Sequence, residues 1–427
     1  MLTSLSDASI KAAYKLASAQ YATLGIDTEA VLAKLAEIPI SLHCWQGDDV
    51  KGFEALDTAA GGSGIMATGN YPGPATTPEM LRKDAEMALS LIPGKKRFNI
   101  HANYAEQDGP KKVDRDALEP KHFQKWIDWA KKLDIALDFN PTFFDHPLAT
   151  KGTLSNADPK IRKFWVRHGI ASRKIASEMG RQLGKTCITN FWMPDGAKDQ
   201  PADRVAPRQR MTQSLDEIFS VKINPKYNRD ALECKLFGIG LEDYTVVSHE
   251  YSMEYTSAHP QVMTCLDVGH FHPTETIHDK ISAILLFQKE ILLHISRGIR
   301  WDSDHIVVLN DDVRAIFQQV VRGKFLDRVH ISLDFFDGSI NRIGAWVIGM
   351  RAAQRALLAA LLEPVATLQK FERNDDNAMK LALLDELKCF PMGAVWDEYC
   401  RRQKVAVGVD WINILEKYDR NVIKKRK

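Results

Sequence analysis

Short apolar runs alternate with longer amphipathic stretches through most of the 427-residue chain. The stretches between the runs, such as 122–133 and 161–183, repeat their apolar positions with the period of a helix. Eight runs have the composition of strands, although the fifth could also continue a helix: 40–45, 97–103, 135–140, 186–192, 231–237, 263–269, 291–296 and 328–335. Strands alternating with helices predict a parallel sheet, and eight strands over about 300 residues favour a closed (β/α)8 TIM barrel.

The pattern is purely helical at both ends of the chain. Two helical stretches at the start are separated by Gly25, and three more follow the last strand: 4–20 and 27–37, then 345–364, 377–390 and 395–407. We therefore expect N-terminal helices at 1–38, a catalytic barrel at 39–345 and a C-terminal helical extension at 346–427. The extension is expected to pack on the barrel or on another subunit, and the terminal KKRK to be a solvated, frayed end.

Composition and charge narrow the class of protein. Apolar residues make up 45% of the chain and charged residues 26%, which are ordinary values for a globular protein. The formal net charge of +2 gives no support to a nucleic-acid partner. The N-terminus is polar and no run of ~20 apolar residues could span a membrane. The six cysteines form no CxxC pair, so we expect a cytoplasmic protein with reduced thiols and no membrane partner.

Acidic and imidazole side chains gather where the last four predicted strands end. The active site of a parallel barrel forms at the C-terminal ends of its strands. The side chains expected there are Glu233 and Lys235, Asp267 and His270, His294 with the following Asp302 and Asp304, and Asp334. So many buried acids in one place need a cation to neutralise them.

The ligand types and their number predict two metal ions. Carboxylates and imidazoles without a thiolate suit Mn²⁺, Mg²⁺, Co²⁺ or Zn²⁺. One centre would use Glu233, Asp267, His294 and Asp334, and a second would use His270, Asp302 and Asp304. A shared carboxylate would then bridge two ions about 3.5–4 Å apart. Taken singly, a histidine such as His294 is more typical of a protein core, and the two loop aspartates could be caps; the joint pattern favours metal. His272 is expected to be structural, and His305 stays undecided.

The other strand ends carry groups that suit a sugar. Trp45, His101, Asn190 and Trp192 offer aromatic faces, an imidazole and an amide, which match a ligand with many hydroxyls. Both tryptophans could instead belong to the barrel core. The glycine-rich segment 61–73 lacks GxGxxG and GxxxxGK[ST], so we interpret it as a flexible loop over the barrel mouth and not as a nucleotide site.

These residues lie in segments that resemble L-rhamnose isomerases of the enteric type. The resemblance covers nearly the whole chain and is carried above all by SLHCWQGDDVKGFE (41–54), WMPDG (192–196), LDVGHFHPTE (266–275), RWDSDH (300–305) and HISLDFFDGSINRIGAWVIG (330–349). It implies a (β/α)8 barrel, a homotetramer and interconversion of L-rhamnose with L-rhamnulose. It also implies a catalytic and a structural divalent metal, usually Mn²⁺, with Zn²⁺, Co²⁺ or Mg²⁺ as alternatives.

The resemblance also assigns roles to individual positions. Those matching the catalytic metal site are His270, Asp302 and Asp304, with Asp267 shared; those matching the structural site are Glu233, Asp267, His294 and Asp334. Lys235 and His101 match positions that contact the sugar, and Trp192 matches a pocket residue. We expect Lys235, His101 and Asp334 to act in catalysis and Trp45 to help bind the sugar. A hydride shift from C2 to C1 of the open-chain sugar is favoured over a cis-enediol route, which stays open.

Other classes of protein share parts of this pattern. A metal-dependent barrel hydrolase or nuclease would use the same cluster to activate water, but a nucleic-acid substrate fits poorly with the near-zero net charge. A sugar epimerase or aldolase could use the same barrel. A non-catalytic sugar-binding module has no need of two adjacent metal sites.

Overall fold

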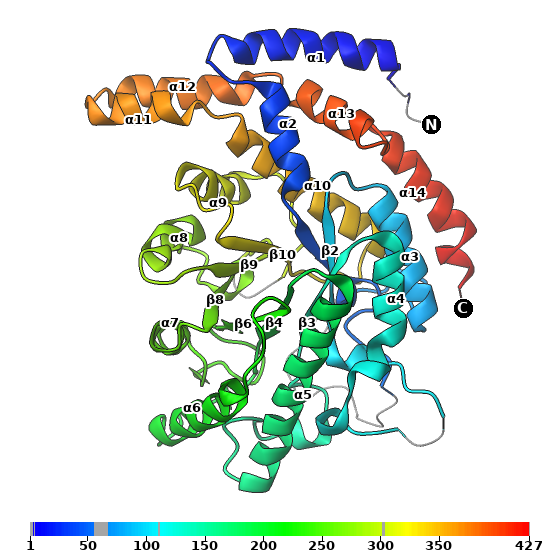
Figure 1. Cartoon of the computed structure of the whole chain (residues 1–427), viewed down its shortest axis with the longest axis vertical. Helices are drawn as coiled ribbons and strands as arrows, with labels where there is room; N and C mark the ends of the chain where they lie inside the picture. The colour runs from blue at the N-terminus through cyan, green and yellow to red at the C-terminus, as the bar shows by residue number, and fades with distance from the viewer. Residues whose placement is uncertain (1–2, 4, 55–66, 110–111, 301–303, 427) are drawn as a thin grey trace.

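The computed structural model describes residues 3, 5–54, 67–109, 112–300 and 304–426. Eight strands close into a parallel barrel in the order β1-β10-β9-β8-β6-β4-β3-β2 (Figure 1). They are β1 (Ile40–His43), β2 (Lys96–His101), β3 (Ala136–Asn140), β4 (Cys187–Phe191), β6 (Asn228–Glu233), β8 (Val262–Asp267), β9 (Ile291–Ile295) and β10 (Val329–Leu333). The predicted (β/α)8 barrel and all eight of its strands are therefore confirmed. The ambiguous fifth run is a strand, but it begins at Asn228 and ends at Glu233.

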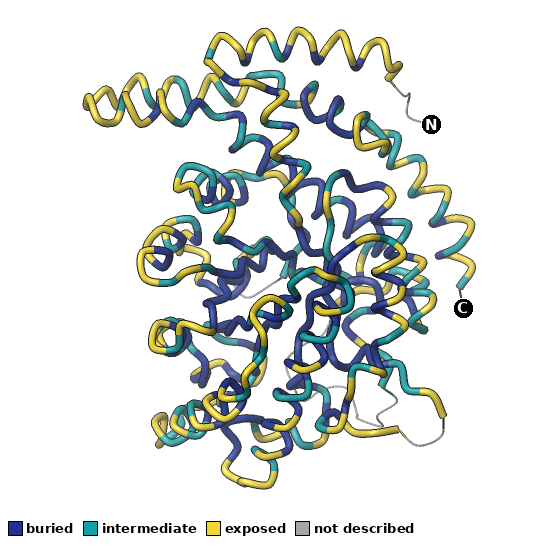
Figure 2. The backbone as a smooth tube through the Cα atoms, in the orientation of Figure 1, coloured by how far each residue is buried: buried dark blue, intermediate teal, exposed yellow. Residues whose placement is uncertain are grey.

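A helix follows each barrel strand and covers its outer face. The barrel helices are α3 (Pro78–Ser90), α4 (Gln124–Leu133), α5 (Pro159–Leu183), α6 (Val205–Ser220), α7 (His249–Ala258), α8 (Ile277–Leu285), α9 (Asp311–Arg322) and α10 (Arg342–Leu361). Figure 2 shows the strands buried and the outward faces of these helices exposed. Helix α10 is the eighth barrel helix, and it spans the predicted boundary between barrel and extension at residue 345.

Local sequence explains where the longest barrel helix begins and ends. The side chain of Asp158 caps the first turn of α5 by accepting a hydrogen bond from the backbone N–H of Lys160, and Pro159 occupies the first helical position. The helix ends at Gly184, whose φ of +65° is the left-handed conformation that glycine adopts without strain.

Short elements connect the barrel strands to the loops of the mouth. The 3₁₀ helices are η1 (Cys44–Gln46), η2 (Ala102–Tyr104), η3 (Arg115–Ala117), η4 (Pro120–Phe123), η5 (Pro147–Ala149), η6 (Val268–His270) and η7 (Ile423–Lys425). Three of them, η1, η2 and η6, follow directly on β1, β2 and β8. Two short strands that were not predicted, β5 (Gly196–Ala197) and β7 (Tyr244–Thr245), pair antiparallel.

Most of the terminal helices form a layer across one end of the barrel (top of Figure 1), and α14 runs down along its side. They are α1 (Asp7–Ala22), α2 (Thr28–Glu37), α11 (Val365–Arg373), α12 (Asn377–Cys389), α13 (Met392–Arg402) and α14 (Asp410–Asn421). Helix α13 packs against α1, whereas α11 and α12 pair and project as an arm. No residue of α12 is buried.

Arg426, near the C-terminus, binds the barrel wall, so the expectation of a frayed end is wrong. The guanidinium of Arg426 donates to both carboxylate oxygens of Asp84 on α3, at 2.6 and 2.7 Å. The hydroxyl of Tyr418 donates to the same carboxylate at 2.9 Å. Asp84 is 3% exposed, so its charge needs these partners.

No single described helix is long and apolar enough to cross a membrane. Helices α10 and α11 satisfy such a length and composition test only when taken together, and they meet at a bend of 56°.

The Arg426–Asp84 contact predicts a measurable contribution to stability. Arg426→Met leaves Asp84 buried without its cation, so we expect the free energy of unfolding to fall by about 3 kcal/mol. Urea denaturation followed by circular dichroism measures this change. The control is Arg420→Met on α14, an arginine whose side chain is 71% exposed and which is expected to be neutral. Equal stability of the two variants would mean that the terminus does not hold the barrel wall.

Candidate metal centre

The first cluster of possible metal-ligand atoms lies at the barrel mouth and is formed by side chains at the ends of four strands. Glu233 ends β6, Asp267 ends β8, His294 lies near the end of β9 and Asp334 directly follows β10. The parallel register places Asp267 beside His294 on neighbouring strands. One oxygen or nitrogen atom from each of these four side chains lies within 4.8 Å of the others. This is the first of the two predicted groups.

A second cluster shares one residue with the first. Asp267, His270 and Asp304 bring ligand atoms within 4.8 Å of one another. His270 lies on η6, the turn that follows β8 directly, so the spacing of three residues returns its ring toward Asp267. Asp302, the remaining residue predicted for this group, lies outside the described residues.

Hydrogen bonds hold the cluster side chains in place. His294 Nδ1 is 3.1 Å from Glu233 Oε2 and 3.1 Å from Asp334 Oδ2. His270 Nδ1 is 3.0 Å from Glu233 Oε1. Two neighbours complete the arrangement, since the indole N–H of Trp45 donates to Asp334 at 2.9 Å and the amide of Asn190 donates to Glu233.

Burial and mutual charge set the pKa values of these groups. Burial opposes ionisation of Glu233, yet the imidazoles of His294 and His270 outweigh it and hold the pKa of Glu233 well below its ordinary value. Burial raises the pKa of Asp267 to about 6. Although burial lowers the pKa of both imidazoles, the carboxylates raise that of His270 to about 10 and that of His294 well above its ordinary value. The cluster therefore attracts positive charge strongly.

Three observations indicate that the residues of these two clusters suit a divalent cation. The donor set consists of carboxylates and imidazoles, which suit Mn²⁺, Mg²⁺, Co²⁺ or Zn²⁺. Asp267 Oδ2 is buried and makes no hydrogen bond with the described residues. Glycine at 269 also lets the carboxylates lie close to the turn, because a Cβ there would lie 2.4 Å from Asp304 Oδ1 and 3.3 Å from Asp267 Oδ1.

A cavity of about 690 Å³ opens above both clusters. Its wall includes the sugar-binding candidates together with ligands of both clusters: Trp45, His101, Trp192, Lys235, Glu233, His270, Asp304 and Asp334. Lys235 follows the end of β6, and its ammonium lies 3.4 Å from His270 Nε2 and 5.0 Å from the ring centre of Trp192. The cavity therefore combines a cation and an aromatic face with the acidic cluster.

His101 faces this cavity as a neutral hydrogen-bond acceptor. Burial lowers the pKa of His101 to about 3. Its Nδ1 lies 3.2 Å from the hydroxyl of Thr142, and that hydroxyl donates to Asn103 Oδ1 at 3.3 Å. We therefore assign the ring proton to Nδ1, which leaves Nε2 as the acceptor.

The described part of the glycine-rich segment lies at the rim of the cavity. Thr68 lines the cavity. The backbone of 67–73 is held to the loop after β10, because Tyr71 N–H donates to the carbonyl of Gly338 at 2.8 Å and Gly338 N–H donates to that of Thr68 at 3.0 Å. Residues 61–66 of the predicted loop lie outside the described residues.

The structure brings together every described residue that the sequence analysis proposed for the site. Their roles as ligands and catalytic groups stay predictions. His272 lies apart from the site: its side chain is exposed and contacts Thr274. His305, which was left undecided, lines the cavity.

Some residues of the cavity wall were not predicted from the sequence. Asn140 ends β3 and lines the cavity, and its place as the last residue of a predicted strand was a usable signal. Val50 also lines the cavity, with a φ of +64° that is rare for a β-branched residue. The neighbouring Asp49 is held there by Arg342, which donates to both of its carboxylate oxygens at 2.8 and 2.7 Å. No local sequence pattern predicts the positive φ of Val50.

Comparison with known proteins gives a consistent result. The family model described as L-rhamnose isomerase (RhaA) matches residues 8–426. The chain is 53% identical over 418 residues to a protein named L-rhamnose isomerase from Rhodopirellula baltica, covering 98% of this chain and 97% of the relative. It is 52% identical over 417 residues to one from Mannheimia succiniciproducens and over 419 residues to one from Yersinia pseudotuberculosis, in each case covering 98% of this chain and 99% of the relative.

Solved structures give a weaker likeness. A structure of L-ribulose 3-epimerase aligns with a TM-score of 0.48 at 11% identity, covering 75% of this chain and 95% of that one. A D-allulose 3-epimerase from a Methylomonas species aligns with the same TM-score of 0.48 at 12% identity, covering 75% of this chain and 99% of that one.

The close contact at Gly269 predicts an effect on metal binding. Gly269→Ala places a methyl group against Asp304 and Asp267, so we expect Mn²⁺ affinity to fall about 10–100-fold. Titration calorimetry of the chelator-stripped protein measures it. The control is Gly393→Ala, where nothing lies within 4 Å of the added Cβ. Unchanged affinity in Gly269→Ala would show that the second cluster is not a metal site.

Proposed function

The chain belongs to the L-rhamnose isomerase family, and on that premise we propose that it interconverts the aldose L-rhamnose and the ketose L-rhamnulose. The observation that carries the proposal is the pair of carboxylate–imidazole clusters at the floor of one large cavity, with Lys235 and Trp192 in its wall. Such a cavity suits a small polyhydroxylated substrate held by its oxygens.

Mn²⁺ is the cation we propose for both centres, with Zn²⁺, Co²⁺ and Mg²⁺ as alternatives. His270, Asp302, Asp304 and Asp267 would hold the catalytic ion, and Glu233, Asp267, His294 and Asp334 the structural one. When bound, the cation supplies Lewis-acid polarisation of the substrate carbonyl and electrostatic stabilisation of a developing oxyanion.

Lys235 is proposed to act at the carbonyl oxygen O1. Its ammonium lies beside His270 and over the face of Trp192, so its direction is fixed before the sugar enters. A positioned N–H donor at O1 stabilises the negative charge that grows there as the aldehyde is reduced. The face of Trp192 would cover the apolar side of the sugar.

His101 is proposed to accept a proton when the sugar ring opens. Opening a pyranose removes the proton of the hydroxyl at C1 and breaks the bond between C1 and the ring oxygen. Neutral His101 can take that proton at Nε2, which lies 3.5 Å from the amide nitrogen of Asn140, and can return it to the ring oxygen as the bond to C1 breaks; a protonated imidazole could not accept it. Trp45 packs against His101 at 4.8 Å between ring centres and fixes the ring's orientation.

We favour a hydride shift over a cis-enediol route, because the enediol route needs a carboxylate that is available as a base. In the shift, the hydride moves from C2 to C1 and the proton of O2 is transferred to O1, so no base removes a carbon-bound proton. Of the acids that line the cavity, Glu233, Asp304 and Asp334 belong to the ligand clusters, whereas Glu242 and Asp337 do not. Asp334 is further held by Trp45 and His294, and we propose that it orients the hydroxyl at C2.

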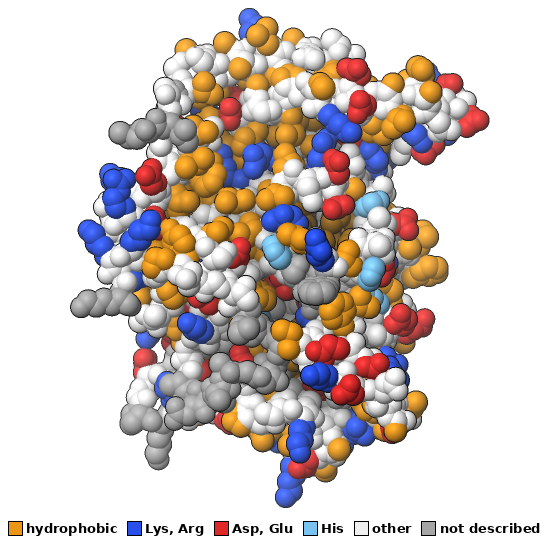
Figure 3. All heavy atoms as spheres, turned by 180° about the vertical axis from the view of Figure 1, so that it is seen from behind, with side chains coloured by type: hydrophobic (Ala, Val, Ile, Leu, Met, Phe, Trp, Pro, Cys, Tyr) orange, Lys and Arg blue, Asp and Glu red, His pale blue; other side chains and the backbone are white. Residues whose placement is uncertain are grey.

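We also propose that the protein is a cytoplasmic homotetramer. All six cysteines are free, which suits a reducing compartment. The arm of α11 and α12 carries exposed apolar side chains, including Met379 at 55% and Leu381 at 68% exposed. Figure 3 shows hydrophobic side chains gathered on the upper half of the rear face. Surfaces of this kind mark sites of protein association.

The isomerase activity is expected to depend on added metal. Chelator-stripped protein given L-rhamnose should form ketose only after Mn²⁺ is restored, as a colorimetric ketose assay would measure. His270→Asn and Asp302→Asn should remove most turnover while leaving the circular dichroism spectrum unchanged. Lys222→Met, a change on the loop between α6 and β6, is the matched control. A folded, metal-loaded protein that forms no ketose would overturn the assignment of substrate.

The route of hydrogen transfer has a separate isotopic test. Reaction in ²H₂O should give L-rhamnulose without deuterium at C1, because the hydride passes directly between the two carbons. Substrate labelled with deuterium at C2 should carry the label to C1. Mass spectrometry and NMR of the product measure both. Incorporation of nearly one solvent deuterium at C1 would establish the enediol route instead.

A further inference from the structure

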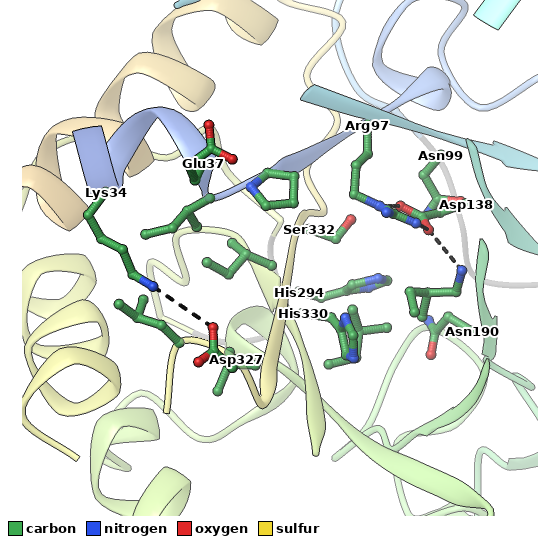
Figure 4. Close-up of a pocket in the computed structure, with 17 residues that line it drawn as sticks. Lys34, Glu37, Arg97, Asn99, Asp138, Asn190, His294, Asp327, His330 and Ser332 are labelled. Atoms are coloured by element: carbon green, nitrogen blue, oxygen red, sulfur yellow. Dashed lines mark hydrogen bonds and ion pairs between the residues drawn. The ribbon is translucent and has the colours of Figure 1, made fainter. Parts of the chain in front are cut away.

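A second cavity, of about 220 Å³, lies inside the barrel beneath the metal clusters (Figure 4). Its lower end is lined by Lys34 and Glu37 of α2 and by Asp327, all with side chains exposed to solvent. Its upper end is lined by Asn190 and His294. The cavity therefore extends from the base of the barrel to the underside of the first cluster.

Polar and apolar side chains both line this cavity. Arg97 on β2 pairs with Asp138 on β3, donating from Nε to Oδ2 at 2.9 Å, and Asn99 and Ser332 lie in the same wall. Ile188 on β4 and Leu292 on β9 also line the cavity, and they pack in an apolar cluster with Ala231, Met263 and Cys265. The polar residues of the wall can offer hydrogen bonds to a small occupant.

Four side-chain atoms at this cavity make no hydrogen bond with the described residues. They are Asn99 Oδ1, Asn190 Oδ1, Ser332 Oγ and His294 Nε2. Each residue is nearly inaccessible, with exposures of 2%, 1%, 2% and 0% in the same order. A buried polar atom without a partner is costly, and buried water commonly supplies that partner. At ~30 Å³ per molecule, the cavity has room for several waters.

The two nitrogens of His294 face in different directions. Nδ1 lies against Glu233 and Asp334 in the first cluster, at 3.1 Å from each. His294 also lines the cavity, and its Nε2 makes no hydrogen bond with the described residues. A histidine that binds a metal through one nitrogen donates its other N–H to a fixed acceptor, which sets the tautomer and the orientation of the ring. No protein group among the described residues serves His294 in that way.

We propose that the barrel cavity is a water-binding site, in which ordered water accepts the Nε2–H of His294 and is itself held by Asn99, Asn190 and Ser332. The water fixes the imidazole with Nδ1 toward the cation. Ser332 and Asn99 are then positioning residues for the metal, acting through water. The inference rests on the proposed metal role of His294, and the solvent-exposed lower end lets the water be replenished from the base of the barrel.

The chain supplies a matched pair of serines for the test. Ser332 on β10 and Ser41 on β1 are register partners on neighbouring strands, and both are buried. The hydroxyl of Ser41 donates to Asp138 at 2.7 Å, so its partner is protein. Valine at either position places the same apolar side chain in the barrel interior, but only at 332 does it displace water next to His294.

Two measurements decide the proposal: Mn²⁺ titration of the chelator-stripped full-length protein, and a high-resolution crystal structure of each Mn²⁺-loaded form. We expect water within hydrogen-bond distance of His294 Nε2 in the wild type and its loss in Ser332→Val, with Mn²⁺ affinity lowered about 10–100-fold. Ser41→Val should keep both the water and an affinity close to wild type. Asn99→Leu, which keeps the volume but removes the polar atoms, gives the same comparison if Ser332→Val does not fold.

Two results would overturn the proposal. One is a wild-type cavity without water at His294 Nε2, and the other is equal Mn²⁺ affinity in the Ser332 and Ser41 variants. Failure of the wild type to bind Mn²⁺ at all would count instead against the proposed metal centre, and the crystal structure would still decide whether water occupies the cavity.

Discussion

The burial of several carboxylates at one point of the barrel mouth is the constraint on which the site depends. Glu233, Asp267 and Asp334 cannot all be ionised there without compensating positive charge. The imidazoles supply it: the pKa of His270 rises to about 10 because Asp267 and Glu233 surround it, although burial acts in the opposite direction. The same arrangement suits the cluster to bind a divalent cation, which would replace the protons that the imidazoles carry.

The barrel provides this arrangement through register and not through any local motif. In a parallel barrel, equivalent positions of neighbouring strands lie side by side, so Asp267 and His294 meet although they belong to separate βα units. The turn after β8 then adds His270, and the lack of a side chain at Gly269 lets Asp304 lie close to that turn. Loops built on rigid strands can differ between enzymes, while the ligand positions at the strand ends remain fixed.

Much of this organisation could be predicted from the sequence because it depends on short-range patterns. The period of apolar residues gave the strands and helices, and barrel topology then brought the acidic strand ends together. The contact between Arg426 and Asp84 could not be found in this way, since the two residues are 342 positions apart and neither lies in a motif. The left-handed Asp49 and Val50 are similar, because Arg342, which binds the carboxylate of Asp49, is 293 positions away along the chain.

The polar interior beneath the site shows why stability and function make different demands on the barrel. A wall made only of apolar residues such as Ile188 and Leu292 would avoid the cost of burying polar groups. The chain instead also lines the cavity with Arg97 and Asn99 on β2 and Asp138 on β3. These residues contribute no ligand to either cluster. These polar residues make sense if the layer beneath the metal site must offer hydrogen bonds to Nε2 of His294. A ligand imidazole that can rotate holds its cation less well than one that is fixed at both nitrogens.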